Sequence, residues 1–199
     1  MSVVYYSMEF FVVDWETYHD HIFELGKKIV ASGKKIDLIV AIARGGLMPA
    51  RILSDLTELP ITTFTISSYH DLKQSSIPQI SLHLGNKLHN KKILLIDDVS
   101  DTGKSFIRAV DYLKSLGAEE IVTASVYIKP KTVFIPDFYL LSTDKWIVFP
   151  HDVKETVDSL YKIGIKEGKT PEEITKQIES IGFSPKQVKF FLEQNAKSK

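Results

Sequence analysis

Two adjacent carboxylates and a short glycine-containing loop are the residues of this chain best suited to chemistry. The segment ILLIDDVSDTGKS, residues 93–105, places Asp97 and Asp98 directly after an apolar run. Backbone amides at the start of a helix bind phosphate, and Gly103 allows the backbone to approach such a group closely. Neighbouring carboxylates accept hydrogen bonds from the vicinal hydroxyls of a sugar or hold a hydrated Mg²⁺. The segment therefore predicts a site for a sugar phosphate.

The triplet Gly103-Lys104-Ser105 also invites a different interpretation, the P-loop of a nucleotide hydrolase. That motif requires a glycine five residues before Gly103, and position 98 is Asp. A carboxylate in that turn would also repel a triphosphate. A further alternative, a loop of ordinary helix-capping residues, assigns no ligand to the segment. The sugar phosphate is favoured because it uses both the carboxylates and the loop.

The elements that must position these residues alternate between strands and helices. Apolar or β-rich runs predict strands over residues 38–43, 62–67, 93–97 and 121–127. Helical spacing predicts helices over 47–56 and 106–116, and one over 15–32 that starts after Asp14, stops at Gly33 and places five apolar residues on one face: Trp15, Tyr18, Ile22, Leu25 and Ile29. This alternation is typical of an α/β, doubly wound, mainly parallel sheet flanked by helices. Ligands bind such sheets at the carboxyl ends of the strands, so the loops after Ala43, Asp97 and Tyr127 are the expected location of the chemistry.

Two regions depart from the alternation. Residues 68–92 are polar, lack sustained periodicity and hold three of the six histidines, so we expect a long mobile excursion there. From Lys154 on, the pattern predicts three helices, two of them opened by the capping boxes Thr170-Pro171-Glu172-Glu173 and Ser184-Pro185-Lys186-Gln187 and separated by Gly182. We expect a main domain over residues 1–152 and a C-terminal helical appendage over 153–199.

Composition excludes several classes of protein. The 199 residues include no cysteine, which excludes thiol catalysis, Cys-ligated zinc and iron–sulfur clusters. Lys and Arg together number 25 and Asp and Glu together 25, and this zero formal net charge argues against nucleic acid as a partner. Apolar stretches are too short to span a membrane, and the start MSVVYYSMEF lacks the features of a signal peptide, so a cytoplasmic protein is expected.

The segment ILLIDDVSDTGKS resembles the 5-phosphoribosyl-1-pyrophosphate (PRPP) binding motif of the type I phosphoribosyltransferases. The resemblance extends over about residues 37–152. Ala43-Arg44-Gly45-Gly46 resembles the pyrophosphate loop of that family, Ser68-Tyr69 the start of its flexible hood loop, and Lys129-Pro130 with Trp146-Ile147 its purine pocket. These features are most similar to the 6-oxopurine branch, which uses hypoxanthine, guanine or xanthine. The stretch ARGGLMPARIL is most similar to the bacterial xanthine-guanine type.

The resemblance implies a role for each residue that binds PRPP. Asp97 and Asp98 would hold the ribose hydroxyls. Arg44 and Gly45 would bind pyrophosphate, with a cis peptide bond before Arg44. The 5′-phosphate would lie in the loop made of Asp101, Thr102, Gly103, Lys104 and Ser105.

The resemblance also implies roles in base and metal binding. Lys129 would donate to the purine 6-oxygen, Trp146 would stack on the ring, and the Ile147 backbone would meet the exocyclic edge. Asp152 and Asp97 would contact Mg²⁺ directly or through water. Each role has an alternative in which the residue binds no ligand. Arg44 would then be a surface residue, Lys129 a solvated loop lysine and Trp146 a core residue, and Asp152 would bind nothing. His151, His70, His83 and His89 are expected at the surface because no metal-ligand spacing connects them.

The implied reaction is transfer of phosphoribose from PRPP to N9 of a 6-oxopurine, which yields a purine nucleoside monophosphate and pyrophosphate with Mg²⁺ as cofactor. Asp101 resembles the candidate base that accepts the N7 proton; the alternative is that it only caps the following helix. The hood, about residues 68–90, would close over the site and exclude water. A homodimer is expected from the family.

The competing class is a regulatory protein that binds PRPP without transferase activity. Its C-terminal helices would then bind DNA or a partner, although their modest charge disfavours recognition of DNA bases. Arg44, Asp101, Lys129 and Trp146 favour catalysis, because a sensor of PRPP alone needs no purine pocket.

Overall fold

The computed structural model describes residues 2–5, 8–67, 78–85 and 88–197. The chain forms two compact units: a central unit of His19–Asp144, and a terminal unit that combines Met1–Tyr18 with Lys145–Lys199. These are packing units, and the division into functional domains at residue 152 stays a prediction.

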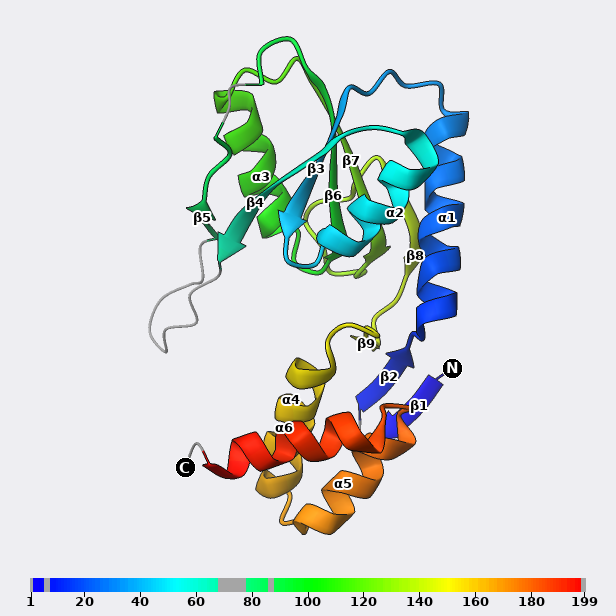
Figure 1. Ribbon diagram of the computed structural model, residues 1–199, viewed down its shortest axis with the longest axis vertical. Helices are drawn as coiled ribbons and strands as arrows, with labels where there is room; N and C mark the ends of the chain where they lie inside the picture. Colours follow the sequence, from blue (N-terminus) through cyan, green and yellow to red (C-terminus); the bar gives the residue numbers. More distant parts are fainter. Residues whose placement is uncertain (1, 6–7, 68–77, 86–87, 198–199) are drawn as a thin grey trace. The chain divides into compact units, whose positions relative to one another are not determined.

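A six-stranded sheet lies at the centre of the central unit (Figure 1). Its strands, in spatial order, are β5 (Gln79–Leu82), β4 (Ile61–Ser67), β3 (Leu38–Ala43), β6 (Lys92–Ser100), β7 (Glu120–Ile128) and β8 (Phe138–Ser142). Neighbouring strands are parallel except β4 and β5, which are antiparallel. The expected doubly wound, mainly parallel α/β sheet is confirmed.

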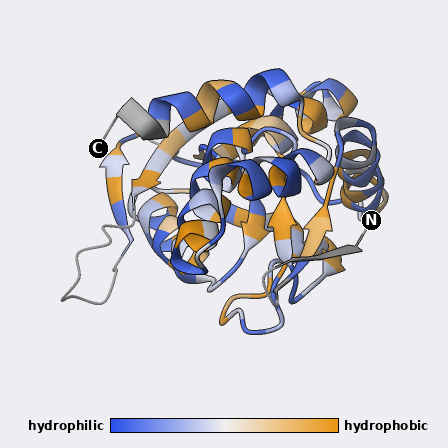
Figure 2. Ribbon diagram, turned by 90° about the horizontal axis from the view of Figure 1, so that it is seen from below, coloured by the Kyte–Doolittle hydropathy of each residue, from blue (hydrophilic) through white to orange (hydrophobic). Residues whose placement is uncertain are grey.

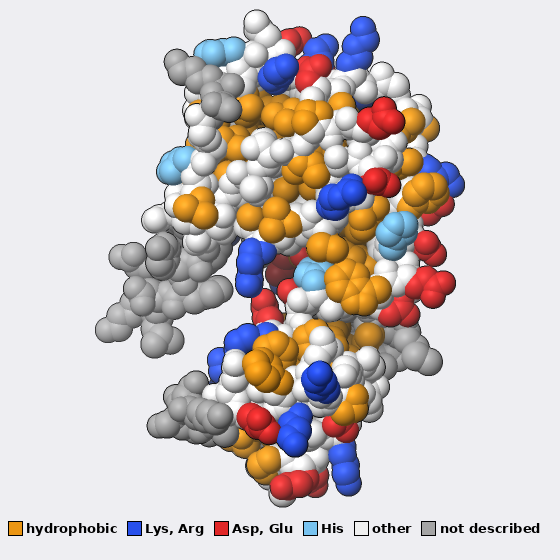
Figure 3. Space-filling view, viewed as in Figure 1, with side chains coloured by type: hydrophobic (Ala, Val, Ile, Leu, Met, Phe, Trp, Pro, Cys, Tyr) orange, Lys and Arg blue, Asp and Glu red, His pale blue; other side chains and the backbone are white. Residues whose placement is uncertain are grey.

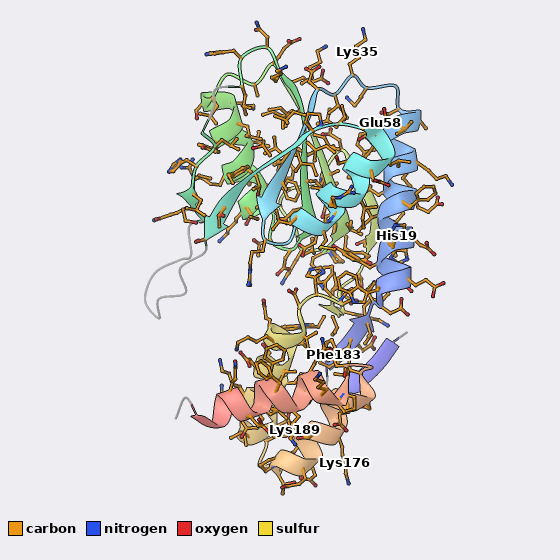
Figure 4. All side chains as sticks on the ribbon, in the orientation of Figure 1. His19, Lys35, Glu58, Lys176, Phe183 and Lys189 are labelled. Atoms are coloured by element: carbon orange, nitrogen blue, oxygen red, sulfur yellow. The ribbon has the colours of Figure 1, made fainter. Side chains whose placement is uncertain are left out.

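Helices cover both faces of this sheet. In Figure 1, α3 (Lys104–Ser115) lies on one side of β3 and β6, and α1 (Trp15–Ala31) and α2 (Leu47–Thr57) lie on the other. Glu58, labelled in Figure 4, ends α2 with a positive φ of 58°. Because both faces of β3 and of the first half of β6 are covered, apolar residues are needed at successive positions there, and Figure 2 shows central strands coloured mostly as hydrophobic. The core under α3 comprises Val40, Ile42, Phe64, Ile93, Leu95, Phe106, Ala109 and Leu113.

The first helix follows its prediction with one exception. The Thr17 amide donates to Asp14 Oδ1 at 2.7 Å, so Asp14 is the expected N-cap, and Gly33 has the positive φ (66°) of a helix stop. Four of the five expected positions are fully buried, but Trp15 is 53% exposed. Trp15 is the first residue of the helix, and its ring centroid lies 6.3 Å from that of His151.

Two other predictions require correction. Strand β6 does not end at Asp97 but continues to Ser100, because its parallel pairing with β7 extends to Ser100 and Ile128. The two carboxylates therefore lie inside a strand. The polar stretch 68–92 is not a continuous excursion, since it contains β5, which pairs with β4 at the edge of the sheet. Residues 68–77 and 86–87 of that stretch lie outside the described residues.

The terminal unit combines three strands with the three expected C-terminal helices. The strands are β1 (Ser2–Tyr5), β2 (Met8–Val12) and β9 (Trp146–Val148), which form a sheet in the order β1-β2-β9. The helices are α4 (Val153–Lys166), α5 (Pro171–Ser180) and α6 (Pro185–Lys197). The capping box at Thr170 is present, and Gly182 has a φ of 107° between α5 and α6. Phe183, labelled in Figure 4, packs against a core that includes Val157, Leu160, Ile174, Ile178 and Val188.

The surface carries charges of both signs. On the face in Figure 3, acidic and basic side chains are interspersed, in keeping with the zero formal net charge. In the described parts of the chain, each helix is too short or too polar to cross a membrane.

Candidate active site

The carboxylate pair lies near the carboxyl end of β6, next to the turn that follows β3. Asp98 is buried at 9% exposure, and its amide donates to Oδ1 of Asp97 at 3.0 Å. Gly45 leaves no gap beside the pair: a Cβ at this glycine would lie 2.5 Å from the Asp98 carboxylate. The fold thus brings the predicted ribose-binding carboxylates against the predicted pyrophosphate loop.

Burial raises the pKa of Asp97 well above its ordinary value, and the like charge of Asp98 raises it further. Hydrogen bonds from the amides of Asp98 and Gly46 oppose the increase without cancelling it. Two adjacent carboxylates held in this way favour a ligand that offers hydroxyl donors or positive charge. Both the ribose hydroxyls and a hydrated Mg²⁺ meet that requirement.

The raised pKa of Asp97 predicts that Asp97→Asn stabilises the protein in metal-free buffer. The pKa of Asp97 is higher in the folded state than in the unfolded state, where it is about 3.9. Ionised Asp97 therefore destabilises the fold, and this destabilisation develops as the pH rises from the unfolded pKa through the folded pKa. Asparagine keeps the acceptor oxygen and removes the charge. The gain in Tm over the wild type should therefore be larger at pH 8 than at pH 4, with each 1 kcal/mol corresponding to roughly 2–4 °C.

Differential scanning fluorimetry in EDTA measures this effect. Asp111→Asn, on the exposed surface of α3, is the matched control and should give no gain that grows with pH. An Asp97→Asn protein with a Tm equal to or below that of the wild type at pH 8 would contradict the prediction.

The turn after β3 holds Arg44 in an exposed position. The peptide bond between Ala43 and Arg44 is cis, as the family resemblance implied. The Gly46 amide donates to the Ile42 carbonyl at 2.9 Å, and a Cβ at Gly46 would overlap the Ile96 carbonyl oxygen on β6. The turn therefore needs glycine in order to pack against β6, and it presents the Arg44 side chain to solvent at the carboxyl edge of the sheet.

The predicted phosphate loop connects β6 to α3. Asp101 and Thr102 are exposed, whereas Gly103 is buried with a φ of 80°. Gly103 is the N-cap residue of α3, and within the described residues no side chain caps this helix. Asp101 instead pairs with Lys131, its Oδ1 lying 3.0 Å from the Lys131 Nζ. The alternative that Asp101 serves as a helix cap is thus wrong.

The structure brings Lys129 next to this loop. Lys129 directly follows β7, and its amide donates to the Ser100 carbonyl at 3.0 Å. Burial lowers the pKa of its half-buried ammonium; the negative charge of Asp101 opposes this shift and the positive charge of Lys131 adds to it. Lys129 is therefore not a fully solvated loop lysine.

A buried tyrosine lies two residues before Lys129 on β7. The Tyr127 side chain is fully buried, and its hydroxyl lies 2.8 Å from Nδ1 of His21 on α1. Burial raises the pKa of Tyr127, and the negative charge of Asp98 adds to the increase. The phenol therefore stays neutral, and the sequence offered no signal for it because Tyr127 belongs to an apolar run.

Three residues that the sequence analysis did not assign to the site lie between the phosphate loop and Lys129. Ser100, Lys131 and Thr132 each form a side-chain contact between these segments. Ser100 adjoins Asp101 in sequence and the other two follow Lys129 closely, so proximity to assigned residues was the only available signal. Their contacts depend on how β6 and β7 pair.

Lys104 and Ser105, also assigned to the phosphate loop, lie in the first turn of α3. The other assigned residues belong to the terminal unit or lie outside the described residues. Trp146 is 42% exposed on β9, and Ile147 is buried. Asp152 is the N-cap residue of α4. Ser68 and Tyr69, assigned to the hood, lie outside the described residues.

His151 was wrongly expected at the surface. Its side chain is only 19% exposed, and its ring stacks on Phe149 and lies 5.4 Å from the Tyr18 ring. The ring fills an aromatic cluster of the terminal unit, which a spacing argument about metal ligands does not reveal. His83 and His89 are exposed, as expected.

Comparison with known proteins identifies relatives of this arrangement. The family model described as a phosphoribosyl transferase domain matches residues 14–157. A purine phosphoribosyltransferase from Pyrococcus horikoshii OT3 is 36% identical, with a TM-score of 0.66 over 71% of this chain and 93% of that chain. A Neisseria gonorrhoeae protein solved with bound ppGpp is 25% identical, with a TM-score of 0.64 over 72% of this chain and 89% of that chain.

A xanthine-guanine-hypoxanthine phosphoribosyltransferase from Helicobacter pylori is similar in fold. It is 24% identical, with a TM-score of 0.65, and the match covers 75% of this chain and 99% of that chain. The family model and the relative from Pyrococcus horikoshii confirm the resemblance that the motifs predicted, and the family match covers every strand of the central sheet.

Proposed function

The chain belongs to the phosphoribosyltransferase family, and from this premise we propose that it transfers the phosphoribosyl group of PRPP to N9 of a 6-oxopurine. The products are a purine nucleoside monophosphate and pyrophosphate. A purine phosphoribosyltransferase among the relatives supports the base class, and that relative covers most of the same fold.

The observation that best supports this proposal is the position of Lys129 beside the phosphate loop. The Lys129 amide is bonded to Ser100, one residue before Asp101. A lysine next to the PRPP motif suits a base that offers a carbonyl oxygen, because an ammonium group only donates hydrogen bonds. A protein that only senses PRPP has no use for this lysine.

The residues around the carboxylate pair suit PRPP with Mg²⁺. Asp97 and Asp98 would hold the ribose hydroxyls, and Arg44 with the Gly45 amide would bind pyrophosphate. Mg²⁺ prefers carboxylate and phosphate oxygens, and a cation would offset both the burial of the Asp97 carboxylate and the like charge of Asp98, which together raise the pKa of Asp97. When bound, Mg²⁺ would neutralise charge on the leaving pyrophosphate. Asp97 and Asp152 are the proposed contacts to it.

The reaction replaces one bond at the anomeric carbon by another. The C1′–O bond to pyrophosphate breaks, its electron pair stays on the pyrophosphate, and N9 of the purine forms a bond to C1′. The purine proton goes to Asp101. The transition state carries positive charge on the sugar, so exclusion of water protects it from hydrolysis. Trp146 and Ile147 keep the base-binding roles that the resemblance implies, and Ser68 and Tyr69 keep the hood role.

Incubation with PRPP, Mg²⁺ and one of four purine bases (hypoxanthine, guanine, xanthine or adenine) tests the proposal. Hypoxanthine, guanine or xanthine should give the corresponding nucleotide by chromatography, and omission of Mg²⁺ should abolish it. Binding of PRPP by calorimetry without nucleotide formation from any base would instead support the PRPP-binding regulatory protein. A cytoplasmic homodimer is part of the proposal on the family resemblance alone, and light scattering measures the dimer.

Base selection by Lys129 predicts that adenine is a poor substrate. The ammonium donates to a 6-oxygen but meets another donor in the 6-amino group of adenine, so kcat/KM for adenine should be roughly 100-fold or more below that for the best 6-oxopurine. Lys129→Met should reduce kcat/KM for the oxopurine and leave adenine nearly unchanged. Lys131→Met is the control for loss of a nearby charge and should keep the preference. Comparable AMP and IMP formation by the wild type would overturn the role of Lys129.

A further inference from the structure

Two hydroxyl groups join the phosphate loop to the loop that carries Lys129. Ser100 Oγ lies 2.9 Å from Thr132 Oγ1 and donates to the Phe134 carbonyl at 2.8 Å. The Phe134 amide donates to Thr132 Oγ1 at 3.3 Å. The Thr132 hydroxyl has two acceptors within reach, the Phe134 carbonyl at 3.1 Å and Ser100 Oγ, and by donating to Ser100 it would leave each of the three donors with its own acceptor. We call this ring of hydrogen bonds the hydroxyl anchor.

The backbone around the hydroxyl anchor is closely fitted. Ser100 is 1% exposed. The Val133 amide donates to the Thr102 carbonyl at 3.1 Å, and a Cβ at Gly103 would lie 2.5 Å from the Phe134 nitrogen. The Phe134 ring stacks on Phe106 of α3 with 5.2 Å between ring centroids. Lys129, Thr132 and Val133 are therefore hydrogen-bonded to Ser100 and Thr102.

We propose that Ser100 and Thr132 are positioning residues for Lys129. The hydroxyl anchor holds residues 129–134 against the phosphate loop and so fixes the Lys129 ammonium relative to the bound phosphoribosyl group. This inference rests on the proposed function, and it assigns neither hydroxyl a contact with substrate.

The path from the hydroxyl anchor to Lys129 is short. The Thr132 amide donates to the Lys129 carbonyl at 3.0 Å, so one hydrogen-bonded turn connects the two residues. A shift of Thr132 therefore moves Lys129. The phosphate loop has a second attachment, because the Ile107 amide donates to the Gly103 carbonyl at 3.1 Å. Lys129, in the proposed function, recognises the base. Loss of the hydroxyl anchor should therefore weaken base binding more than PRPP binding.

Thr132→Val removes the hydroxyl at nearly constant volume and is the first test. The KM for hypoxanthine should rise about 10-fold, the effect expected from one or two lost hydrogen bonds, while kcat falls less than about 3-fold and the Kd for PRPP changes less than about 2-fold. Thr132→Ser keeps the hydroxyl and should restore a KM close to that of the wild type. Thr62→Val, at the start of β4, is the matched control.

Ser100→Ala tests the other half of the hydroxyl anchor. It should give the same split between KM and Kd, and the double variant with Thr132→Val should be little worse than either single variant, because both remove one shared ring of bonds. Fully multiplicative effects on KM would show two independent residues and would overturn the hydroxyl anchor as a unit.

Hydrogen exchange of the free protein supplies a readout that needs no activity. The Lys129 and Val133 amides should exchange faster in Thr132→Val and at the wild-type rate in Thr132→Ser. A wild type that makes no nucleotide refutes the proposed function. If the wild type is active, three results for Thr132→Val would each refute the positioning role instead. These are an unchanged KM for hypoxanthine, equal losses of PRPP and base binding, and unchanged amide exchange.

Discussion

Replacing both site carboxylates, Asp97→Asn with Asp98→Asn, should lower PRPP affinity by about 100-fold. A hydrogen bond to a charged acceptor is stronger than one to a neutral amide by about 1–1.5 kcal/mol, and two such losses together correspond to this factor. The loss should be larger with Mg²⁺ present than without it, because the cation also prefers carboxylate oxygens. Isothermal calorimetry with PRPP measures both values.

The fold should survive this double substitution. Asparagine at position 97 still accepts from the Asp98 amide, and its neutral side chain escapes both effects that raise the pKa of Asp97, burial first and the like charge of Asp98 second. An increased Tm together with lost PRPP binding would identify a pair kept for binding at a cost in stability. The matched control is Asp20→Asn with Asp111→Asn, which removes two exposed carboxylates of the central unit. If the double site variant binds PRPP as tightly as this control, Asp97 and Asp98 do not hold the ribose.

The sequence predicted the central sheet well because its strands are buried on both faces. Strand β3 and residues 93–96 of β6 are continuous apolar runs, and such runs between helical patterns permit few other folds. Short edge strands have no such pattern. In β5 (Gln79–Leu82) only Ile80 is partly buried, so the residues show at most a weak alternation. The pairing with β4, rather than the sequence pattern of β5, makes this segment a strand.

The site residues divide in the same way. The sequence singles out Asp97, Asp98 and Arg44 because their types are unusual after apolar runs, and their roles stay predictions. The contacts of Ser100 and Thr132 were not found, since they depend on the register in which Ser100 pairs with Ile128. Gly103 was only partly explained by the sequence. Its position in the motif predicts close approach of the backbone to phosphate, and the structure shows a second reason for glycine, because a side chain here would have no room against Phe134.

Asp101→Asn should separate chemistry from binding. The carboxylate is exposed and lies 3.0 Å from Lys131, and α3 begins at Gly103 without using it as a cap. Its removal therefore takes away one exposed ion pair, worth at most about 1 kcal/mol, so Tm should change little. Turnover should nevertheless fall by roughly 10²- to 10⁴-fold, as expected when a general base is lost, while the Kd for PRPP changes much less.

Lys131→Met is the control that gives this experiment its resolution. It breaks the same ion pair but leaves the carboxylate in place, so a role of Asp101 confined to the pair predicts equal turnover in the two variants. A catalytic role predicts a much lower turnover in Asp101→Asn. Single-turnover nucleotide formation at saturating PRPP and hypoxanthine compares them directly. Near-normal turnover in Asp101→Asn would reject the base and leave its contact with Lys131 as the function of this residue, whereas a deep loss in Asp101→Asn alone would identify the group that takes the purine proton.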